Sequence, residues 1–240
     1  MNILLPMLIL QLQAVQAPQW RPVHTARVHW QEGTALYTLA IETPADTASV
    51  EEQRLRIRIP GRRDYVLRGD EGGFVSSVQA TLNSSLVADN LARSPYFYLS
   101  PNLRGVRGTP MLVVFGWAFA SDPGSIHIIA LDSMGYPIEV FHDSTFLLTA
   151  LVDLDADGRA EIIGKRTLSQ CGGCDDCSYD PYSVYHLPNP PHHRARYDLA
   201  LSRSYNLAHY VWAGPSPTES LEVNVCRPGK PHIAGGRHRG

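Results

Sequence analysis

The sequence predicts an all-β protein folded as an antiparallel meander. Short apolar segments rich in β-branched residues recur along the 240-residue chain, and glycine or proline separates nearly all of them, as is usual between strands. One segment alternates strictly: Leu55, Ile57 and Ile59 would lie on one face of a strand, with an arginine at each position between them. We expect that strand to be half exposed, with its arginines toward water.

Most of the chain is accounted for by segments with the length and composition of strands. These predicted strands cover residues 35–41, 55–59, 65–67, 74–80, 96–99, 111–120, 126–131, 138–142, 145–152 and 161–165. Residues 84–93 are the best candidate for a short helix, because their apolar residues recur near helical spacing.

Two neighbouring segments resemble copies of one unit. Residues 130–140 and 152–162 each consist of a strand, a turn containing Asp and Gly, and another strand. Together with residues 111–120 they give about five successive antiparallel strands, an arrangement found in the blades of β-propellers. The chain is short for a complete propeller, so we expect a partial or small β-propeller, with a two-sheet β-sandwich as the alternative.

The segment Asp-Leu-Asp-Ala-Asp-Gly-Arg-Ala-Glu at 153–161 places four carboxylates in nine residues. Aspartates this close repel one another unless they surround a cation, and Ca²⁺ accepts six to eight oxygen ligands. We expect side-chain ligands from Asp153, Asp155, Asp157 and Glu161, and a fifth ligand from the backbone carbonyl of Arg159. A solvated hairpin turn without metal is the alternative, although Asp-Gly alone would suffice for that turn.

An EF-hand is excluded because its loop needs a bidentate glutamate at the twelfth position, where this chain has Gly164. The apolar segments that flank the loop are typical of strands. Over residues 146–164 the pattern resembles the calcium loop of FG-GAP or VCBS-type repeats, the strand-loop-strand units of integrin-like β-propellers. The resemblance implies one structural calcium ion, because only one of the two copies has all the acidic residues.

Residues 1–17 predict a secretory signal peptide, because a short apolar run ends in Val15-Gln16-Ala17. The alternatives are an uncleaved amphipathic start or a buried first strand. We therefore expect a secreted protein, extracellular or periplasmic, with a single all-β domain over 18–234 and a disordered tail over 235–240. No later segment is long and apolar enough to predict a membrane helix.

The four cysteines, Cys171, Cys174, Cys177 and Cys226, lie in the last third of the chain. Export to an oxidising compartment favours two disulfides, whose pairing the sequence leaves open. The alternative is a zinc site made by the first three cysteines with Cys226, His186 or His192, because thiolates at C-x-x-C-x-x-C spacing can converge on one ion.

The net charge of −2 and the absence of a long basic run argue against a nucleic-acid-binding protein. No local catalytic motif is present. We therefore expect a binding or scaffold module of FG-GAP/VCBS type rather than an enzyme, with an unidentified protein or carbohydrate ligand. The alternative is an extracellular hydrolase whose active site lies in the tyrosine- and histidine-rich C-terminal loops.

Overall fold

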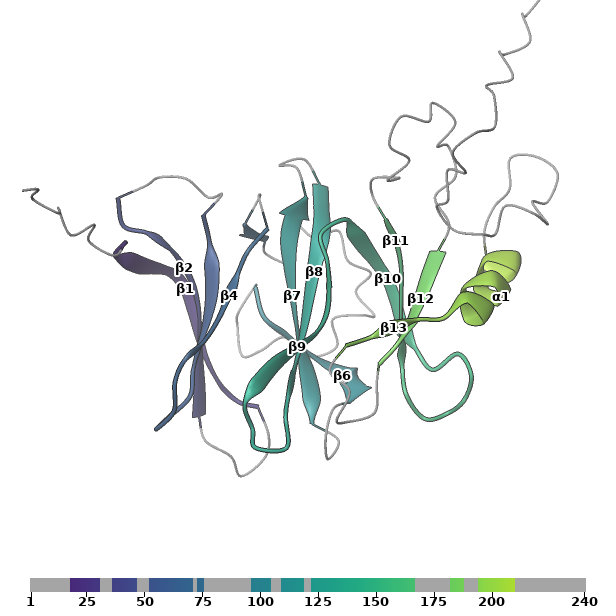
Figure 1. The fold of residues 1–240 in the computed structure, drawn as a ribbon, viewed down its shortest axis with the longest axis horizontal. Helices are drawn as coiled ribbons and strands as arrows, with labels where there is room; N and C mark the ends of the chain where they lie inside the picture. The colour runs from purple at the N-terminus through teal and green to yellow at the C-terminus, as the bar shows by residue number, and fades with distance from the viewer. Residues whose placement is uncertain are drawn as a thin grey trace, which may run out of the picture.

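Three antiparallel β-sheets stacked side by side form the body of the molecule, and one helix packs beyond the third sheet (Figure 1). The computed structural model describes residues 18–30, 36–46, 52–70, 73–75, 96–104, 109–118, 122–166, 182–187 and 194–209. Within these residues no sheet closes on itself. The predicted all-β class and the antiparallel meander are confirmed, and the described residues form three sheets.

The first sheet contains four strands in sequence order, and the third sheet does the same, while the central sheet contains five. The first sheet consists of β1 (Trp20–His29), β2 (Leu36–Pro44), β3 (Arg54–Arg58) and β4 (Tyr65–Arg68). The central sheet consists of β5 (Phe74–Val75), β6 (Tyr98–Arg104), β7 (Pro110–Ala118), β8 (Asp122–Leu131) and β9 (Pro137–Asp143). The third sheet consists of β10 (Phe146–Val152), β11 (Glu161–Arg166), β12 (Tyr182–His186) and β13 (Arg196–Tyr197), followed by α1 (Leu199–His209).

The first sheet has one buried and one charged face, as the alternation in β3 predicts. Leu55 and Ile57 are fully buried, whereas the arginines beside them face outward. On the outer face Arg54 and Arg56 both contact Glu42, at 2.7 and 3.4 Å. The charged face suits water, and the apolar face must pack against another sheet.

The central sheet is buried on both faces, which explains why β7 is a nearly continuous apolar run. Leu112 and Val114 belong to a core shared with the first sheet. Val113 and Phe115, which alternate with them along β7, belong to a second core shared with the third sheet. Each successive residue of β7 therefore contributes to the opposite core.

The expected five consecutive strands between residues 111 and 166 are present as β7 to β11, but they divide between two sheets. A corner at Asp143–Thr145 separates β9 from β10, where the Thr145 N–H donates to the Asp143 side chain at 3.0 Å. The chain thus leaves the central sheet and starts the third. Both predicted Asp/Gly units are hairpins, one joining β8 to β9 and the other joining β10 to β11.

Helix α1 was not predicted, because the side that it buries is polar. Ser202 and Asn206 are each 1% exposed and lie one helical turn apart. They hydrogen-bond the backbone of β12: the Val184 N–H donates to Ser202 Oγ, and the Tyr182 N–H donates to Asn206 Oδ1. The helix therefore covers a stretch of β12 edge that would otherwise present unpaired backbone groups.

Strand β1 was also not predicted, because most of its residues are polar or exposed and few face the core. Strand β12 and the short β13 lie in the tyrosine-rich region that sequence reasoning left without assigned strands. The proposed helix at 84–93, the segments 1–17 and 235–240, and all four cysteines lie outside the described residues. Among the residues that are described, no helix is long and apolar enough to cross a membrane.

Candidate functional site

The acidic loop joins β10 to β11 at one end of the third sheet. The strands pair up to Val152 and Glu161, and the intervening residues form a tight turn. Two of these residues have left-handed backbone conformations, Ala156 with φ 61° and Gly158 with φ 86°. Glycine adopts such angles without cost, whereas alanine does not, so the loop is held in a conformation that its own sequence disfavours locally.

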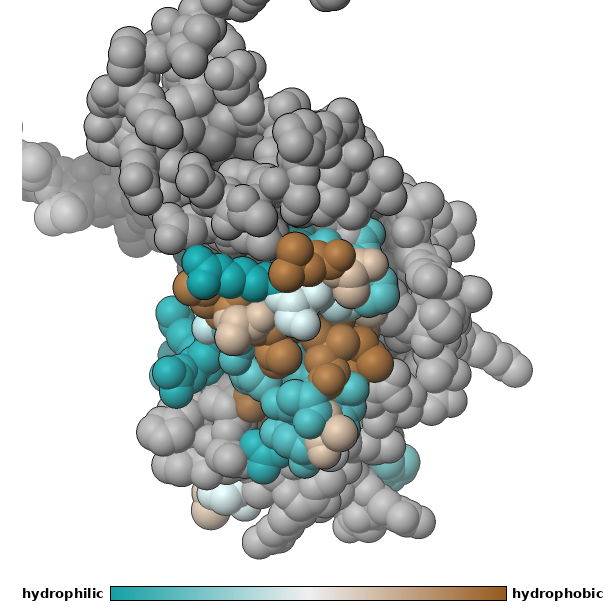
Figure 2. Space-filling view, turned by 90° about the vertical axis from the view of Figure 1, so that its right-hand side faces the viewer, coloured by the Kyte–Doolittle hydropathy of each residue, from teal (hydrophilic) through white to brown (hydrophobic). Residues whose placement is uncertain are grey.

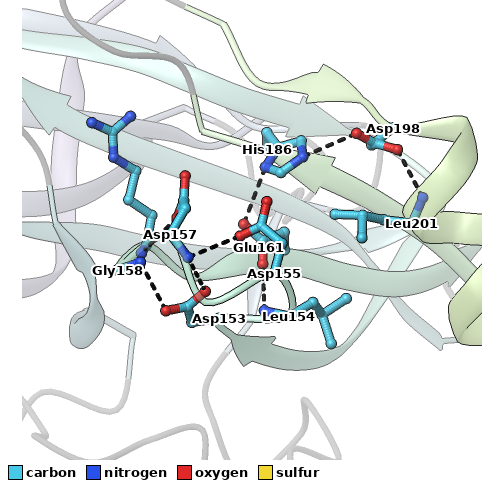
Figure 3. Close-up of polar contacts among 10 residues, drawn as sticks. Asp153, Leu154, Asp155, Asp157, Gly158, Glu161, His186, Asp198 and Leu201 are labelled. Carbon is cyan, nitrogen blue, oxygen red and sulfur yellow. Dashed lines mark hydrogen bonds and ion pairs between the residues drawn. The ribbon is translucent and has the colours of Figure 1, made fainter.

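The aspartates of the loop turn inward and accept backbone hydrogen bonds, as Figure 3 shows. The Asp157 N–H donates to both Asp153 Oδ1 and Asp155 Oδ1, each at 3.1 Å. The Gly158 N–H donates to Asp153 Oδ2 at 2.9 Å. One oxygen from each of Asp153, Asp155 and Asp157 lies within 4.8 Å of the others. Three of the four predicted carboxylates therefore lie close together, and ligation of calcium by the full set stays a prediction.

These hydrogen bonds leave room for a cation. An ionised carboxylate offers about four lone-pair sites, and each aspartate here uses one or two of them for backbone N–H groups. Three exposed carboxylates this close repel one another, and a divalent ion would remove that repulsion. Hard oxygen donors of this kind suit Ca²⁺ better than a softer metal.

Glu161, the fourth predicted acid, begins β11 and is completely buried. Its Oε2 accepts the Leu154 N–H at 2.7 Å, which ties the start of β11 to the start of the loop. One of its oxygens also lies within 4.8 Å of an Asp155 oxygen. Burial raises the pKa of Glu161, and the negative charge of Asp155 raises it further, against the Leu154 hydrogen bond. A cation beside this carboxylate would stabilise its charged form.

His186 and Asp198 extend this network beyond the loop, and neither was predicted to take part in the calcium site. His186 Nδ1 lies 3.1 Å from Glu161 Oε1, and its Nε2 lies 3.0 Å from Asp198 Oδ2 (Figure 3). Both ring nitrogens are thus engaged by carboxylates, and one ligand atom from each of His186, Asp155 and Glu161 lies within 4.8 Å of the others. The alternative that His186 binds zinc with the cysteines involves residues 171–177 and 226, which the structure does not describe.

The remaining predicted positions behave in different ways. The Arg159 N–H donates to Asp157 Oδ1 at 2.9 Å, and ligation by the Arg159 carbonyl stays a prediction. Gly164 lies within β11 opposite Leu148, and a Cβ there would overlap the Phe146 ring and the Leu147 carbonyl. A glutamate could not occupy this twelfth position, which gives a packing reason for the absence of an EF-hand.

A second group of possible ligands, Asp70, His127 and His142, lies elsewhere in the fold and was not predicted. The β8–β9 pairing brings His127 and His142 together, and the packing of the first sheet on the central sheet brings Asp70 to them. No local spacing signal exists that could have identified them. The alternative hydrolase site was expected in the tyrosine- and histidine-rich C-terminal loops, of which residues 188–193 and 210–240 lie outside the described residues, and it stays a prediction.

Comparison of the chain with protein-family models, with curated proteins and with solved structures found no match.

Proposed function

We propose that the chain is a secreted, calcium-stabilised binding or scaffold protein of the FG-GAP/VCBS type. The observation that carries this proposal is the convergence of Asp153, Asp155 and Asp157 in one hairpin, with the buried Glu161 beside them. Stacked antiparallel meanders are also the architecture that a partial propeller requires, which supports the proposed kinship.

A structural role for the ion follows from what the loop is attached to. Glu161 contacts His186 of β12, and His186 contacts Asp198, the residue that precedes α1. The Leu201 N–H of α1 donates to the other Asp198 oxygen at 2.8 Å. A cation held by the loop would therefore stabilise a chain of contacts that joins the β10–β11 hairpin, the next strand and the helix.

The proposed secretion is supported by the apolar N-terminal segment and its Val-Gln-Ala ending. The ligand would be a protein or a carbohydrate. Figure 2 looks onto the side of the molecule that carries α1 and shows apolar residues interspersed with hydrophilic ones. The large exposed apolar residues of the third sheet and α1 are Leu147, Val152, Tyr197, Leu199 and Leu207. Scattered residues of this kind are usual on protein surfaces and identify no particular ligand.

Thermal melting of the full chain in calcium and in chelator tests the proposal. Calcium at 100 times its dissociation constant should stabilise the fold by about 2.7 kcal/mol. For a chain of this size that corresponds to a rise in Tm of about 5 to 10 °C. Magnesium at the same concentration should give a smaller rise in Tm, because Mg²⁺ requires near-ideal octahedral geometry and loses its bound water reluctantly.

Asp155→Asn is the informative variant, because Asp155 approaches both the other aspartates and Glu161. It should lose most of the calcium-dependent rise. Asp46→Asn, which changes an exposed turn residue in the first sheet region, is the matched control and should retain the full rise. An equal Tm in calcium and chelator for the unmodified chain would disprove the calcium site.

A further inference from the structure

A compact group of polar side chains lies where the first sheet meets the central sheet. Asp70 follows directly after β4, His127 lies on β8, and His142 lies on β9. His127 and His142 are register partners across β8 and β9, so their side chains share one face of the central sheet. The two imidazole rings are stacked with centroids 4.4 Å apart and planes 6° from parallel.

His127 is buried and its two ring nitrogens have different surroundings. Nδ1 lies 2.8 Å from Glu139 Oε1, close enough for a strong hydrogen bond. Because a carboxylate only accepts, Nδ1 is the donor in this contact, and in the neutral imidazole Nε2 then carries a lone pair. The buried Nε2 has no hydrogen-bond partner among the described residues.

The unpartnered Nε2 points toward another acceptor. It lies 3.5 Å from Asp70 Oδ2 without forming a hydrogen bond. In the neutral imidazole this nitrogen and the carboxylate oxygen are both acceptors, so a cation between them would bind both. His142 also directs its Nε2 to Asp70, at 3.2 and 3.1 Å from the two carboxylate oxygens. One carboxylate is therefore shared by two imidazoles.

A proton on His127 Nε2 would also satisfy Asp70, since a neutral His142 can donate from its own Nε2. A divalent metal ion is the other species that suits this group, because neutral imidazoles bind it through their Nε2 lone pairs. We propose that Asp70, His127 and His142 form a binding site for a divalent transition metal of the zinc type.

The donor set and the separations of its atoms fit such an ion, and the two rings, which are parallel here, would tilt toward it on binding. Imidazole and carboxylate donors are the usual ligands of zinc, with bonds of about 2.0 to 2.2 Å. Tetrahedral coordination at these lengths separates neighbouring ligand atoms by about 3.3 Å. The separations of Asp70 Oδ2 from the two histidine nitrogens, 3.1 and 3.5 Å, lie on either side of this value.

The surroundings provide the support that metal ligands usually have. Glu139 accepts from His127 Nδ1, which is the carboxylate–histidine pairing found behind metal-binding histidines. The Ser125 hydroxyl hydrogen-bonds Asp70 from β8 and orients the carboxylate. The Asp70 turn is fixed by the Gly73 N–H, which donates to the Asp70 carbonyl at 2.8 Å.

One side of the group is accessible. The side chain of His142 is 37% exposed and that of Asp70 is 21% exposed. His142 and Glu139 also line a pocket of about 210 Å³, which Asp70 and His127 do not line. Three protein ligands beside accessible space leave a fourth position for water, the arrangement of a catalytic and not of a closed structural zinc site. This site is independent of the acidic loop, which lies on the third sheet and offers only oxygen donors.

Titration of the full chain with Co²⁺ and with Zn²⁺, in saturating calcium, tests the proposal. We expect one equivalent of Co²⁺ with visible d–d absorption and without the near-ultraviolet band of thiolate ligation, and displacement of that Co²⁺ by Zn²⁺. No bound metal, or cobalt bound only with a thiolate band, would overturn the proposal.

His142→Asn should weaken binding of this equivalent at least 100-fold, and Glu139→Gln should weaken it 10- to 100-fold. His29→Asn, at an exposed histidine of β1, is the matched control and should bind normally. Should His142→Asn fail to fold, Asp70→Asn and Glu139→Gln decide the matter. Affinity unchanged in these variants would show that the metal binds elsewhere and would refute the site.

Discussion

Ala156 is a residue whose backbone conformation is set by its neighbours and not by its own preference. Its φ of 61° is left-handed, a region that costs an L-residue about 1 to 2 kcal/mol. Hydrogen bonds from the Asp157 and Gly158 N–H groups to Asp153 fix the chain on its C-terminal side. The aspartates thus hold the strained residue in place, as expected of a loop shaped to bring their oxygens together.

Ala156→Gly should raise the free energy of unfolding by about 0.5 to 1 kcal/mol, because relief of the left-handed strain outweighs the added freedom of glycine in the unfolded chain. Gly158→Ala is its counterpart. It should destabilise the fold by about 1 kcal/mol through backbone strain, since nothing within 4 Å would touch the new methyl group. Urea unfolding measures both. A loss of stability in Ala156→Gly would contradict this account of the loop.

Asp198 combines two functions at the start of α1. Its Oδ1 accepts the Leu201 N–H, as a helix N-cap does, and its Oδ2 contacts His186. The Leu201 hydrogen bond lowers the pKa of Asp198, and His186 lowers it further, against the effect of burial. A carboxylate with a lowered pKa in the folded state stabilises the fold above its unfolded pKa of about 3.9, and this contribution is lost as the pH falls through the folded value.

Asp198→Asn tests this assignment, because asparagine caps a helix about as well as aspartate but carries no charge. The variant should be less stable than the unmodified chain near pH 6. The difference should shrink as the pH falls below about 3.9, where Asp198 of the unfolded chain takes up a proton, and should vanish only below the lowered pKa of the folded state. Urea midpoints of both proteins between pH 3 and pH 6 measure it. A difference that does not change over this range would exclude a charge effect.

At the scale of elements, α1 replaces a neighbouring strand along part of the β12 edge. Asn206 accepts the Tyr182 N–H at 2.8 Å, and its Nδ2 donates to the carbonyl of Tyr182 at 2.7 Å. These are the two hydrogen bonds that a paired strand residue would make. The short β13 covers the next part of the same edge, at Tyr185 and His186.

Asn206→Ala should destabilise the fold by about 1 to 3 kcal/mol, because it leaves the buried N–H and carbonyl of Tyr182 unpaired. Leu207→Ala, at a side chain that is 59% exposed in the same helix, should change stability by less than about 0.5 kcal/mol. Urea unfolding monitored by circular dichroism compares them. Equal effects of the two substitutions would show that α1 does not stabilise β12 in this way.

The same elements show which parts of the fold sequence patterns can predict. Alternation in β3 correctly predicted which face Leu55, Ile57 and the neighbouring arginines occupy, because one face of that sheet is apolar and the other is more exposed to solvent. Helix α1 was missed because its buried side consists of Ser202 and Asn206, and a helix that docks by hydrogen bonds has no apolar periodicity.

The candidate sites also differ in whether local sequence patterns could predict them. The carboxylates of the acidic loop are neighbours in sequence, so their spacing predicted their convergence. His186 is 25 residues from its partner Glu161, and Asp70 is 72 residues from His142. Contacts of this range depend on strand order and on which sheets stack, and the sequence of a single chain contains no local pattern that specifies either.

At the scale of the whole molecule, the central sheet couples the stability of the first sheet to that of the third, because it shares a core with each. Neighbouring residues of β8 belong to different cores, with Ile128 in the core shared with the third sheet and Ile129 in the core shared with the first. The Trp30 indole N–H also donates to the Pro110 carbonyl at 2.8 Å, which ties the end of β1 to β7. Loss of the central sheet would expose one face of each outer sheet.

Ile128→Ala should therefore destabilise both outer sheets together. Removal of this fully buried side chain should cost about 2 to 5 kcal/mol. If the sheets unfold as one unit, native-state hydrogen exchange should show an equal loss of protection at Leu39 in the first sheet and at Ile162 in the third, although Ile128 belongs only to the core on the third-sheet side.

Val66→Ala, at a 48% exposed position of β4, is the control and should leave protection at both amides nearly unchanged. Loss confined to Ile162 would mean that the first sheet folds independently, and a central sheet buried on both faces would then not suffice to couple its neighbours.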